Sequence, residues 1–289
     1  MDPDLSPDGK CRRTGDLSGI EIRLLIEAIY LRYGYDFRDY ACASLNRRVR
    51  NFMIKSGYKQ ISRIIPDILR DENLFDEFVN HICVSVTEMF RDPSVYREVR
   101  EEVIPFLASF PRLNIWHAGC ATGEEVYSFA ILLDEEGLYE RTNIYATDMD
   151  PRSVEIAEQG IYPVEAVQQG TDNYKKSGGK ASFSDYYHAR YGKVILPSRL
   201  KQNITFSTHN LVTDTVFNRM HLIVCRNVLI YFNKQLQDRV LELLSRSLVH
   251  NGILVLGTKE RLDFSAVSGE FEPVAPKLRI YRKTGLNGS

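Results

Sequence analysis

From about residue 112 onward, the chain alternates short apolar segments with amphipathic ones, and this alternation restricts the fold more than any other feature. The apolar segments, which we predict to be strands, span residues 113–120, 142–150, 203–211, 220–227 and 253–260. The amphipathic segments, which we predict to be helices, span residues 124–137, 151–162 and 233–252. Such alternation predicts an α/β fold with a mostly parallel sheet and helices on both faces. Ligands of such sheets bind at the carboxyl ends of the strands.

The first part of the chain has a different pattern. Residues 1–16 are polar, and we expect them to be frayed or disordered. The apolar side chains that follow recur at spacings of three and four, which predicts a small all-helical domain over residues 17–80. The first predicted apolar stripe consists of Ile22, Leu24, Leu25, Ala28, Ile29 and Leu31.

Two further stretches interrupt or end the alternation. Residues 165–203 are polar and too long for an ordinary loop, so we expect a lid or a small hairpin unit there. Residues 271–283 predict a final pair of strands.

Composition excludes several classes of protein. A formal net charge of -1 excludes a chain that binds nucleic acid over its whole surface. The five cysteines are odd in number and form no C-x-x-C pair, which argues against a disulfide framework or a zinc site and fits a reducing cytosol. The start lacks the apolar region of a secretory signal, and no run approaches the roughly 18 to 20 apolar residues of a membrane span. We therefore expect a cytoplasmic protein without direct membrane insertion.

Residues 41–70 are strongly basic despite the neutral total. This range contains one acidic residue, Asp67, and seven basic residues: Arg47, Arg48, Arg50, Lys55, Lys59, Arg63 and Arg70. A solvated helix face explains most runs of this kind. A docking face for an acidic partner is the alternative.

The segment NIWHAGCATGEEVYSFAILL, residues 114–133, combines a strand, a loop of small residues and a helix that opens with two glutamates. It does not fit the dinucleotide fingerprint, because Glu124 stands where the third glycine would follow Gly119. No G-K-[ST] follows either, so a phosphate is disfavoured. Besides complementing the helix dipole, acids at a helix start suit a cationic ligand. The next strand ends at Asp148, where an acid can bind a ribose diol, so S-adenosylmethionine fits both features.

Four stretches, in this order and spacing, resemble the CheR family of chemotaxis receptor methyltransferases over nearly the whole chain. They are SVTEMFRD (85–92), GCATGEEVYSFA (119–130), ATDMD (146–150), and FSTHNL (206–211) followed by CRNVLIYF (225–232). The resemblance implies a Rossmann-like class I methyltransferase domain, an N-terminal helical domain and a small antiparallel β insertion. The implied boundaries are a helical domain at 17–80, a linker contributing to the cofactor site at 81–95, and a methyltransferase domain at 96–285 with the β-subdomain around 183–203.

The resemblance also implies a protein-glutamate O-methyltransferase, which methylates chemoreceptor glutamates with S-adenosylmethionine and releases S-adenosylhomocysteine. The cofactor contacts that it implies are Ser85, Thr87, Arg91, Gly119, Glu125, Asp148, Asn210, Arg226 and Asn227. Arg91 and Tyr231 are implied to act in catalysis, by orienting the acceptor carboxylate and by lying beside the methyl group. The alternative role of Arg91 is a salt bridge in the linker, and that of Tyr231 is packing in the core. Many members have asparagine where Ser85 stands, which alters that contact.

The implied chemistry agrees with the residue types present. A glutamate acceptor, with a reference pKa of about 4.3, is already anionic at neutral pH, so no general base is needed. The sulfonium donor is itself activated, so no metal is expected. His117 and His209 are interpreted as structural residues, since neither belongs to a His-Asp or Cys-His pair.

The implied partner is the cytoplasmic helical region of a methyl-accepting chemoreceptor. Arg47, Arg48 and Arg50 would form the docking face for it, and a receptor's C-terminal peptide would bind the β-subdomain. We expect no nucleic-acid partner and recruitment to receptor arrays at the membrane. Two other functions stay open: methylation of nitrogen or oxygen in a small molecule or RNA, and a signalling module that senses the cofactor without catalysis.

Overall fold

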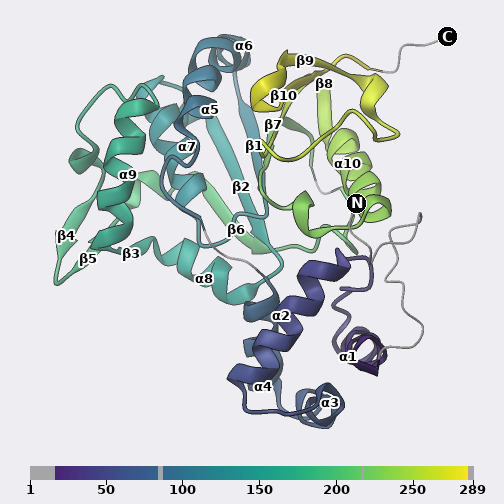
Figure 1. Ribbon diagram of the computed structural model, residues 1–289. Coiled ribbons are helices and arrows are strands. Elements are labelled where there is room, and N and C mark those ends of the chain that lie inside the picture. Colours follow the sequence, from purple (N-terminus) through teal and green to yellow (C-terminus); the bar gives the residue numbers. More distant parts are fainter. Residues whose placement is uncertain (1–16, 84–86, 217, 286–289) are drawn as a thin grey trace. The chain divides into compact units, whose positions relative to one another are not determined.

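The computed structural model describes residues 17–83, 87–216 and 218–285 (Figure 1). Within these ranges the chain divides into two compact units. The first unit combines the residues before position 84 with residues 228–240, and the second combines residues 87–227 with residues 241–285. None of the helices in the described ranges has the length and apolarity required to span a bilayer.

The first unit is all-helical, as the sequence predicts (Figure 1). Its helices are α1 (Leu17–Tyr33), α2 (Cys42–Lys55), α3 (Ile61–Ile68) and α4 (Glu72–Ile82). Residues 228–240 add the 3-10 turn η5 (Leu229–Tyr231) and the first half of α10 (Lys234–Ser247). Asp71 caps α4, because its carboxylate accepts the backbone N–H groups of Asn73 and Leu74.

The apolar face of α1 is narrower than its periodicity predicts. The buried residues are Ile22, Leu25, Ile26 and Ile29. In contrast, Leu24 is 57% exposed and Leu31 is 76% exposed, so their assignment to the core stripe is wrong. Consecutive helical residues point about 100° apart. Leu24 therefore turns away from the core that buries Leu25.

The second unit contains the predicted, mostly parallel sheet. Among its described residues the sheet has seven strands in the order β6-β2-β1-β7-β8-β10-β9. The strands are β1 (Leu113–Ala118), β2 (Thr142–Asp148), β6 (Ile204–Thr208), β7 (Met220–Cys225), β8 (Leu248–Leu256), β9 (Phe271–Ala275) and β10 (Ile280–Lys283). All neighbouring pairs from β6 to β8 are parallel, and β10 is antiparallel to both of its neighbours. The chain leaves β1 for β2 on one side and later reaches β7 on the other, so the topological switch point lies at β1.

Helices cover this sheet, and the central strands are buried as a result. The helical segments are α5 (Pro93–Glu98), the π-helical turn η1 (Val99–Val103), α6 (Ile104–Ala108), α7 (Glu124–Glu135), α8 (Pro151–Gln159) and α9 (Val164–Lys176). β1 and β7 bury nearly all of their side chains, which is typical of strands covered on both faces. α7 is buried from Val126 to Leu133. The loop that precedes α7 is thereby fixed against the core of this unit.

The polar stretch 165–203 contains more regular structure than its composition indicates. The expected hairpin is present: β3 (Ile161–Pro163), β5 (Lys193–Ile195) and β4 (His188–Arg190) form a separate antiparallel sheet. The first third of the stretch belongs to α9, a helix that the sequence did not predict. Its buried residues are only Val167, Gly170 and Tyr174, so the apolar periodicity is too sparse to predict a helix.

α10 ends earlier than predicted. We expected a helix up to Gly252, but α10 ends at Ser247 and β8 begins at Leu248. Leu248 pairs with Met220 of β7, so the sheet ladder takes up these residues. Asn251 has a φ of 61°, a left-handed conformation that no helix continues through.

The described cysteines include one that forms a disulfide, which the expectation of a reducing cytosol did not predict. Cys120 and Cys225 are buried free thiols. Cys42 is the disulfide-bonded residue among the described cysteines.

Candidate cofactor site

The loop between β1 and α7 is tight and contains three residues in the left-handed conformation. Gly119, Ala121 and Gly123 have φ values of 83°, 48° and 92°. The N–H of Gly119 donates to the carbonyl oxygen of Thr147 at 2.8 Å, which holds the loop over the end of β2. A Cβ atom on Gly123 would lie 2.8 Å from that of Ala157. Glycine at position 123 therefore permits both the turn and the close approach of α8.

Asp148 ends β2 beside this loop. Its Oδ2 accepts the N–H of Ala121 at 2.9 Å, and its Oδ1 accepts the N–H of Asp150 at 3.0 Å. Burial raises the pKa of Asp148, and the backbone hydrogen bonds oppose this rise. A carboxylate accepts about four hydrogen bonds, so Asp148 can still accept bonds from a diol. This geometry fits the predicted ribose-binding role.

Arg226, directly after β7, is the centre of a buried ionic network. Its Nη1 lies 2.7 Å from Oε2 of Glu125, and its Nη2 lies 2.7 Å from Oδ2 of Asp92. Nη2 also donates to the carbonyl oxygen of Arg91 at 3.3 Å. The Nε atom of Arg226 is buried and has no partner among the described residues. The network ties the start of α7 to the FRD segment.

Glu125 and Glu124 both open α7, but their surroundings differ. Burial would raise the pKa of Glu125, yet the Arg226 guanidinium and the hydrogen bond from His117 outweigh it and lower that pKa. Glu124 instead accepts the hydroxyl hydrogen of Thr122 at 2.7 Å, and burial raises its pKa. The two pKa values therefore shift in opposite directions, and Glu125, which pairs with Arg226, stands in the position predicted for the cofactor contact.

His117 is buried at the end of β1, beside Glu125. Its Nδ1 lies 3.4 Å from Oε1 of Glu125, and its ring packs edge-on against Phe129. Its Nε2 has no partner among the described residues. The packing agrees with the structural role expected for His117, and the contact with Glu125 adds support to the ionic network.

Arg91 lies between two residues that adopt the left-handed conformation, Phe90 and Asp92, with φ values of 55° and 56°. The N–H of Phe90 donates to Oγ of Ser128 at 2.9 Å. The Phe90 ring is fully buried against Tyr96 and other aromatic rings. The backbone around Arg91 is therefore anchored to α7 on one side and to Arg226 on the other.

The other residues predicted to contact the cofactor are Thr87, Ser85, Asn210 and Asn227. Thr87 is partly buried in the segment that leads to Arg91, whereas Ser85 lies outside the described residues. Oδ1 of Asn210 accepts the N–H of Val212 at 3.0 Å, so this side chain stabilises its own turn. Asn227 follows Arg226 and has a φ of 62°.

Glu260 holds the Asn227 turn, and no motif in the sequence identified it. This carboxylate is 3% exposed, and its Oε2 accepts the N–H groups of Asn227 at 3.1 Å and of Gly257 at 2.5 Å. The only signal was an acid in the predicted strand ILVLGTKE. A charged residue in such a strand indicates a buried partner that the sequence does not identify.

Four of the predicted cofactor residues thus converge at the carboxyl ends of three adjacent strands. Gly119 follows β1, Asp148 ends β2, Arg226 follows β7, and Glu125 faces Arg226 from α7. This edge of the sheet is the switch point at which α/β folds bind ligands. Among the described residues, no group of three or more histidine, cysteine, aspartate or glutamate side chains could hold a metal ion.

Tyr231 and the proposed docking arginines belong to the first unit. The guanidinium carbon of Arg48 lies 4.5 Å from the centroid of the Tyr231 ring, and its Nη1 donates to the carbonyl oxygen of Ile82. Arg50 is exposed and donates to Oγ of Ser18 at 3.1 Å, and Arg47 is exposed. Arg48 is therefore partly buried in internal contacts, which differs from the solvent-facing cation that the basic run indicated.

Comparisons with known proteins agree with this geometry. Residues 85–276 match the family model described as "CheR methyltransferase, SAM binding domain", and residues 20–83 match "CheR methyltransferase, all-alpha domain". The second range covers the helices α1 to α4 of the first unit, and the first range covers the sheet-containing unit up to β9 together with residues 228–240.

Several curated proteins are similar over most of their lengths. The Cher3 protein of Pseudomonas putida is 51% identical over 265 residues, which cover 92% of this chain and 97% of that protein. A chemotaxis protein methyltransferase of Listeria innocua is 30% identical over 79% of this chain and 85% of its own length. A chemotaxis protein methyltransferase of Vibrio cholerae is 27% identical over 78% of this chain and 83% of its own length. The chain therefore belongs to the CheR family and carries its S-adenosylmethionine-binding methyltransferase domain.

Proposed function

We propose that this protein transfers the methyl group of S-adenosylmethionine to glutamate carboxylates in the cytoplasmic helical region of a chemoreceptor. The observation that supports it most is the buried network at Arg226. Two carboxylates, Glu125 and Asp92, face this one guanidinium, so two negative charges and one positive charge leave a net charge of -1. Glu125 is buried and Asp92 is 38% exposed. A partly buried site with one excess negative charge favours a cation, and the ammonium group of the cofactor is one.

Each residue has a separate role in this proposal. The bound cofactor supplies an electrophilic methyl group on a sulfonium. Glu125 binds the ammonium group, and Asp148 accepts hydrogen bonds from the ribose hydroxyls. Arg91 would hold the acceptor carboxylate through one oxygen and leave the other free, and Tyr231 would act beside the methyl group. Alignment within a site that excludes water then accelerates the displacement.

The acceptor is proposed from the chemotaxis names of the relatives and from the charge of α2. Arg47 and Arg50 are exposed, and they carry charge that would attract a helix rich in glutamate. Replacing both by glutamate should raise the KM for the receptor fragment and leave the affinity for S-adenosylhomocysteine unchanged. An unchanged KM would remove the docking role.

The test is methyl transfer to a purified receptor cytoplasmic fragment with S-adenosylmethionine labelled in the methyl group. We expect incorporated label that mild base releases as methanol, because methyl esters hydrolyse there and N-methyl groups do not. A fragment with its acceptor glutamates changed to glutamine is the matched control and should take up no label.

Two results would favour the other functions. Base-stable label would indicate a methyltransferase for a different acceptor. Tight binding of S-adenosylhomocysteine, with no transfer to any receptor fragment, would indicate a cofactor-sensing module. Arg91→Ala should lose most of the transfer rate even at saturating cofactor, since one of its two proposed contacts is with the acceptor.

A further inference from the structure

The segment that carries Tyr231 follows β7 in sequence, yet it packs within the first unit. The N–H of Ala41 donates to the carbonyl oxygen of Tyr231 at 2.8 Å, and the N–H of Asn233 donates to that of Asp39 at 2.8 Å. Tyr40 and Phe232 form an antiparallel bridge between these two bonds. Residues 39–41, which connect α1 to α2, therefore hold the backbone of residues 231–233 from both ends.

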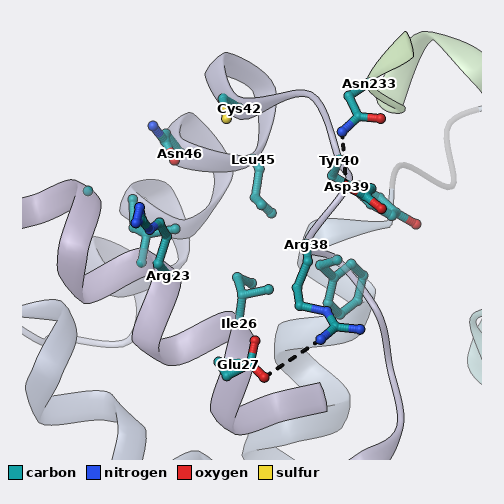
Figure 2. A pocket seen from close by; sticks show the side chains of 13 residues that line it. Arg23, Ile26, Glu27, Arg38, Asp39, Tyr40, Cys42, Leu45, Asn46 and Asn233 are labelled. Atoms are coloured by element: carbon teal, nitrogen blue, oxygen red, sulfur yellow. Dashed lines mark hydrogen bonds and ion pairs between the residues drawn. The ribbon is translucent and has the colours of Figure 1, made fainter. Parts of the chain in front are cut away.

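Side chains strengthen the same connection. Oδ1 of Asp39 accepts a hydrogen bond from the Asn233 amide at 3.1 Å (Figure 2), and its Oδ2 lies 2.6 Å from the Arg239 guanidinium. The rings of Tyr40 and Phe232 pack edge-to-face with centroids 5.1 Å apart. A cavity of about 360 Å³ lies beside this connection, with Asp39, Tyr40 and Asn233 in its wall. The backbone of the Tyr231 segment is thus fixed within the helical unit.

The ring of Tyr231 is held separately, by Arg48. The distance of 4.5 Å between the guanidinium carbon and the ring centroid is within the range of about 6 Å for a cation–π interaction. Arg48 is itself restrained, because its Nη1 donates to the carbonyl oxygen of Ile82 at the end of α4. Tyr231 lies at the end of a single 3-10 turn, which leaves its side chain few constraints from regular structure. The cation therefore restricts the orientation of the ring.

We infer that Arg48 is a positioning residue for Tyr231, so that the helical unit orients the tyrosine hydroxyl as well as contacting the acceptor. The inference rests on the proposed role of Tyr231 in methyl transfer. A guanidinium held by α2 and α4 sets the plane of the ring, and the ring sets the direction of the hydroxyl. Because a misplacement of about 1 Å can cost about 100-fold in rate, loss of Arg48 acts on turnover.

The experiment measures methyl transfer by the full chain carrying Arg48→Met or Arg48→Lys. Methionine keeps much of the length without the charge, and lysine restores a cation. We expect Arg48→Met to lower kcat by about 10- to 100-fold, with little change in the KM for S-adenosylmethionine. Arg48→Lys should keep kcat within about threefold of the wild type. Arg32→Ala is the matched control, because Arg32 makes the same kind of contact in the same unit with a different ring, that of Tyr33, at 5.1 Å.

A double-mutant cycle separates positioning from general destabilisation. In a Tyr231→Phe background no hydroxyl remains to be oriented, so Arg48→Met should have little further effect on kcat. Thermal unfolding of each variant checks that the chain is folded. An unchanged kcat in Arg48→Met, or an equal loss in both backgrounds, would overturn the inference while the wild type still transfers methyl groups. A wild type that transfers none would overturn the proposed function, and the inference with it.

Discussion

Replacing Arg226 by methionine should destabilise the second unit strongly. The Arg226 side chain is 0% exposed and that of Glu125 is 13% exposed, so removal of the guanidinium leaves a buried carboxylate without its partner. Removing one member of a buried ion pair costs about 3–5 kcal/mol. The Asp92 side chain is 38% exposed, so water screens it and its pair adds at most about 1 kcal/mol. We therefore expect a loss of about 3–5 kcal/mol in the free energy of unfolding.

The assay is urea denaturation at neutral pH, followed by the fluorescence of the single tryptophan, Trp116, which is buried in β1. The double variant Arg226→Met/Glu125→Gln removes the isolated charge, and it should recover about half of the lost free energy. The result that would refute this account is a loss below about 1 kcal/mol, or no recovery in the double variant.

The same change should reverse the pH dependence that Glu125 contributes. In the wild type its pKa is lowered below 4.5, so its stabilising contribution is present above 4.5 and is lost as pH falls through the lowered pKa. In Arg226→Met the contribution of Arg226 is lost, and we expect burial, the largest remaining cause, to outweigh the hydrogen bond from His117 and raise that pKa instead. The folded state then binds the proton more tightly than the unfolded chain, so stability decreases as pH rises from 4.5 through the raised pKa. Unfolding curves over this range distinguish the two signs.

Two further predictions concern the loop and the ribose acid. Burial raises the pKa of Asp148 above 3.8. Calorimetric titration should therefore show that S-adenosylhomocysteine binds more weakly as pH falls through that raised pKa, whereas Asp148→Asn should bind it weakly at every pH. A wild-type affinity that did not vary with pH would contradict the ribose role. Gly123→Ala should lower the thermal stability by about 1–3 kcal/mol, because the new Cβ meets Ala157 at 2.8 Å and φ is 92°. Gly57→Ala is the control, since Gly57 has a φ of 79° but open space around it, and an equal loss there would show that the close approach of α8 is unimportant.

The sequence predicted the sheet and the cofactor loop well because both are encoded locally. The strand, glycine loop and helix of residues 113–135 appear in order along the chain, and Asp148 ends the next apolar segment. Parallel strands bring their carboxyl ends to one edge, so order alone places Gly119 near Asp148. The prediction of a binding edge could therefore be made before any side-chain contact was known.

The errors occurred where tertiary contacts outweigh local pattern. α9 is polar because the face away from its few buried residues is solvated, so its periodicity was too weak to detect. α10 ends at Ser247 because Leu248 pairs with β7. The local sequence favours continuing the helix, and it does not show that a neighbouring strand competes for these residues. Leu24 and Leu25 are equally apolar, and only the position of the core decides that Leu25 is the buried one.

The sequence by itself determined the class of fold, the loop between β1 and α7, and the types of charged residue near that loop. The tertiary structure alone decided which of these charges meet. Arg226 joins Glu125 and Asp92 across 101 and 134 residues of chain, and the helical unit holds Tyr231 through Arg48. Periodicity encodes which face of an element is buried, whereas contacts at such separations depend on how the elements pack, which no local pattern records.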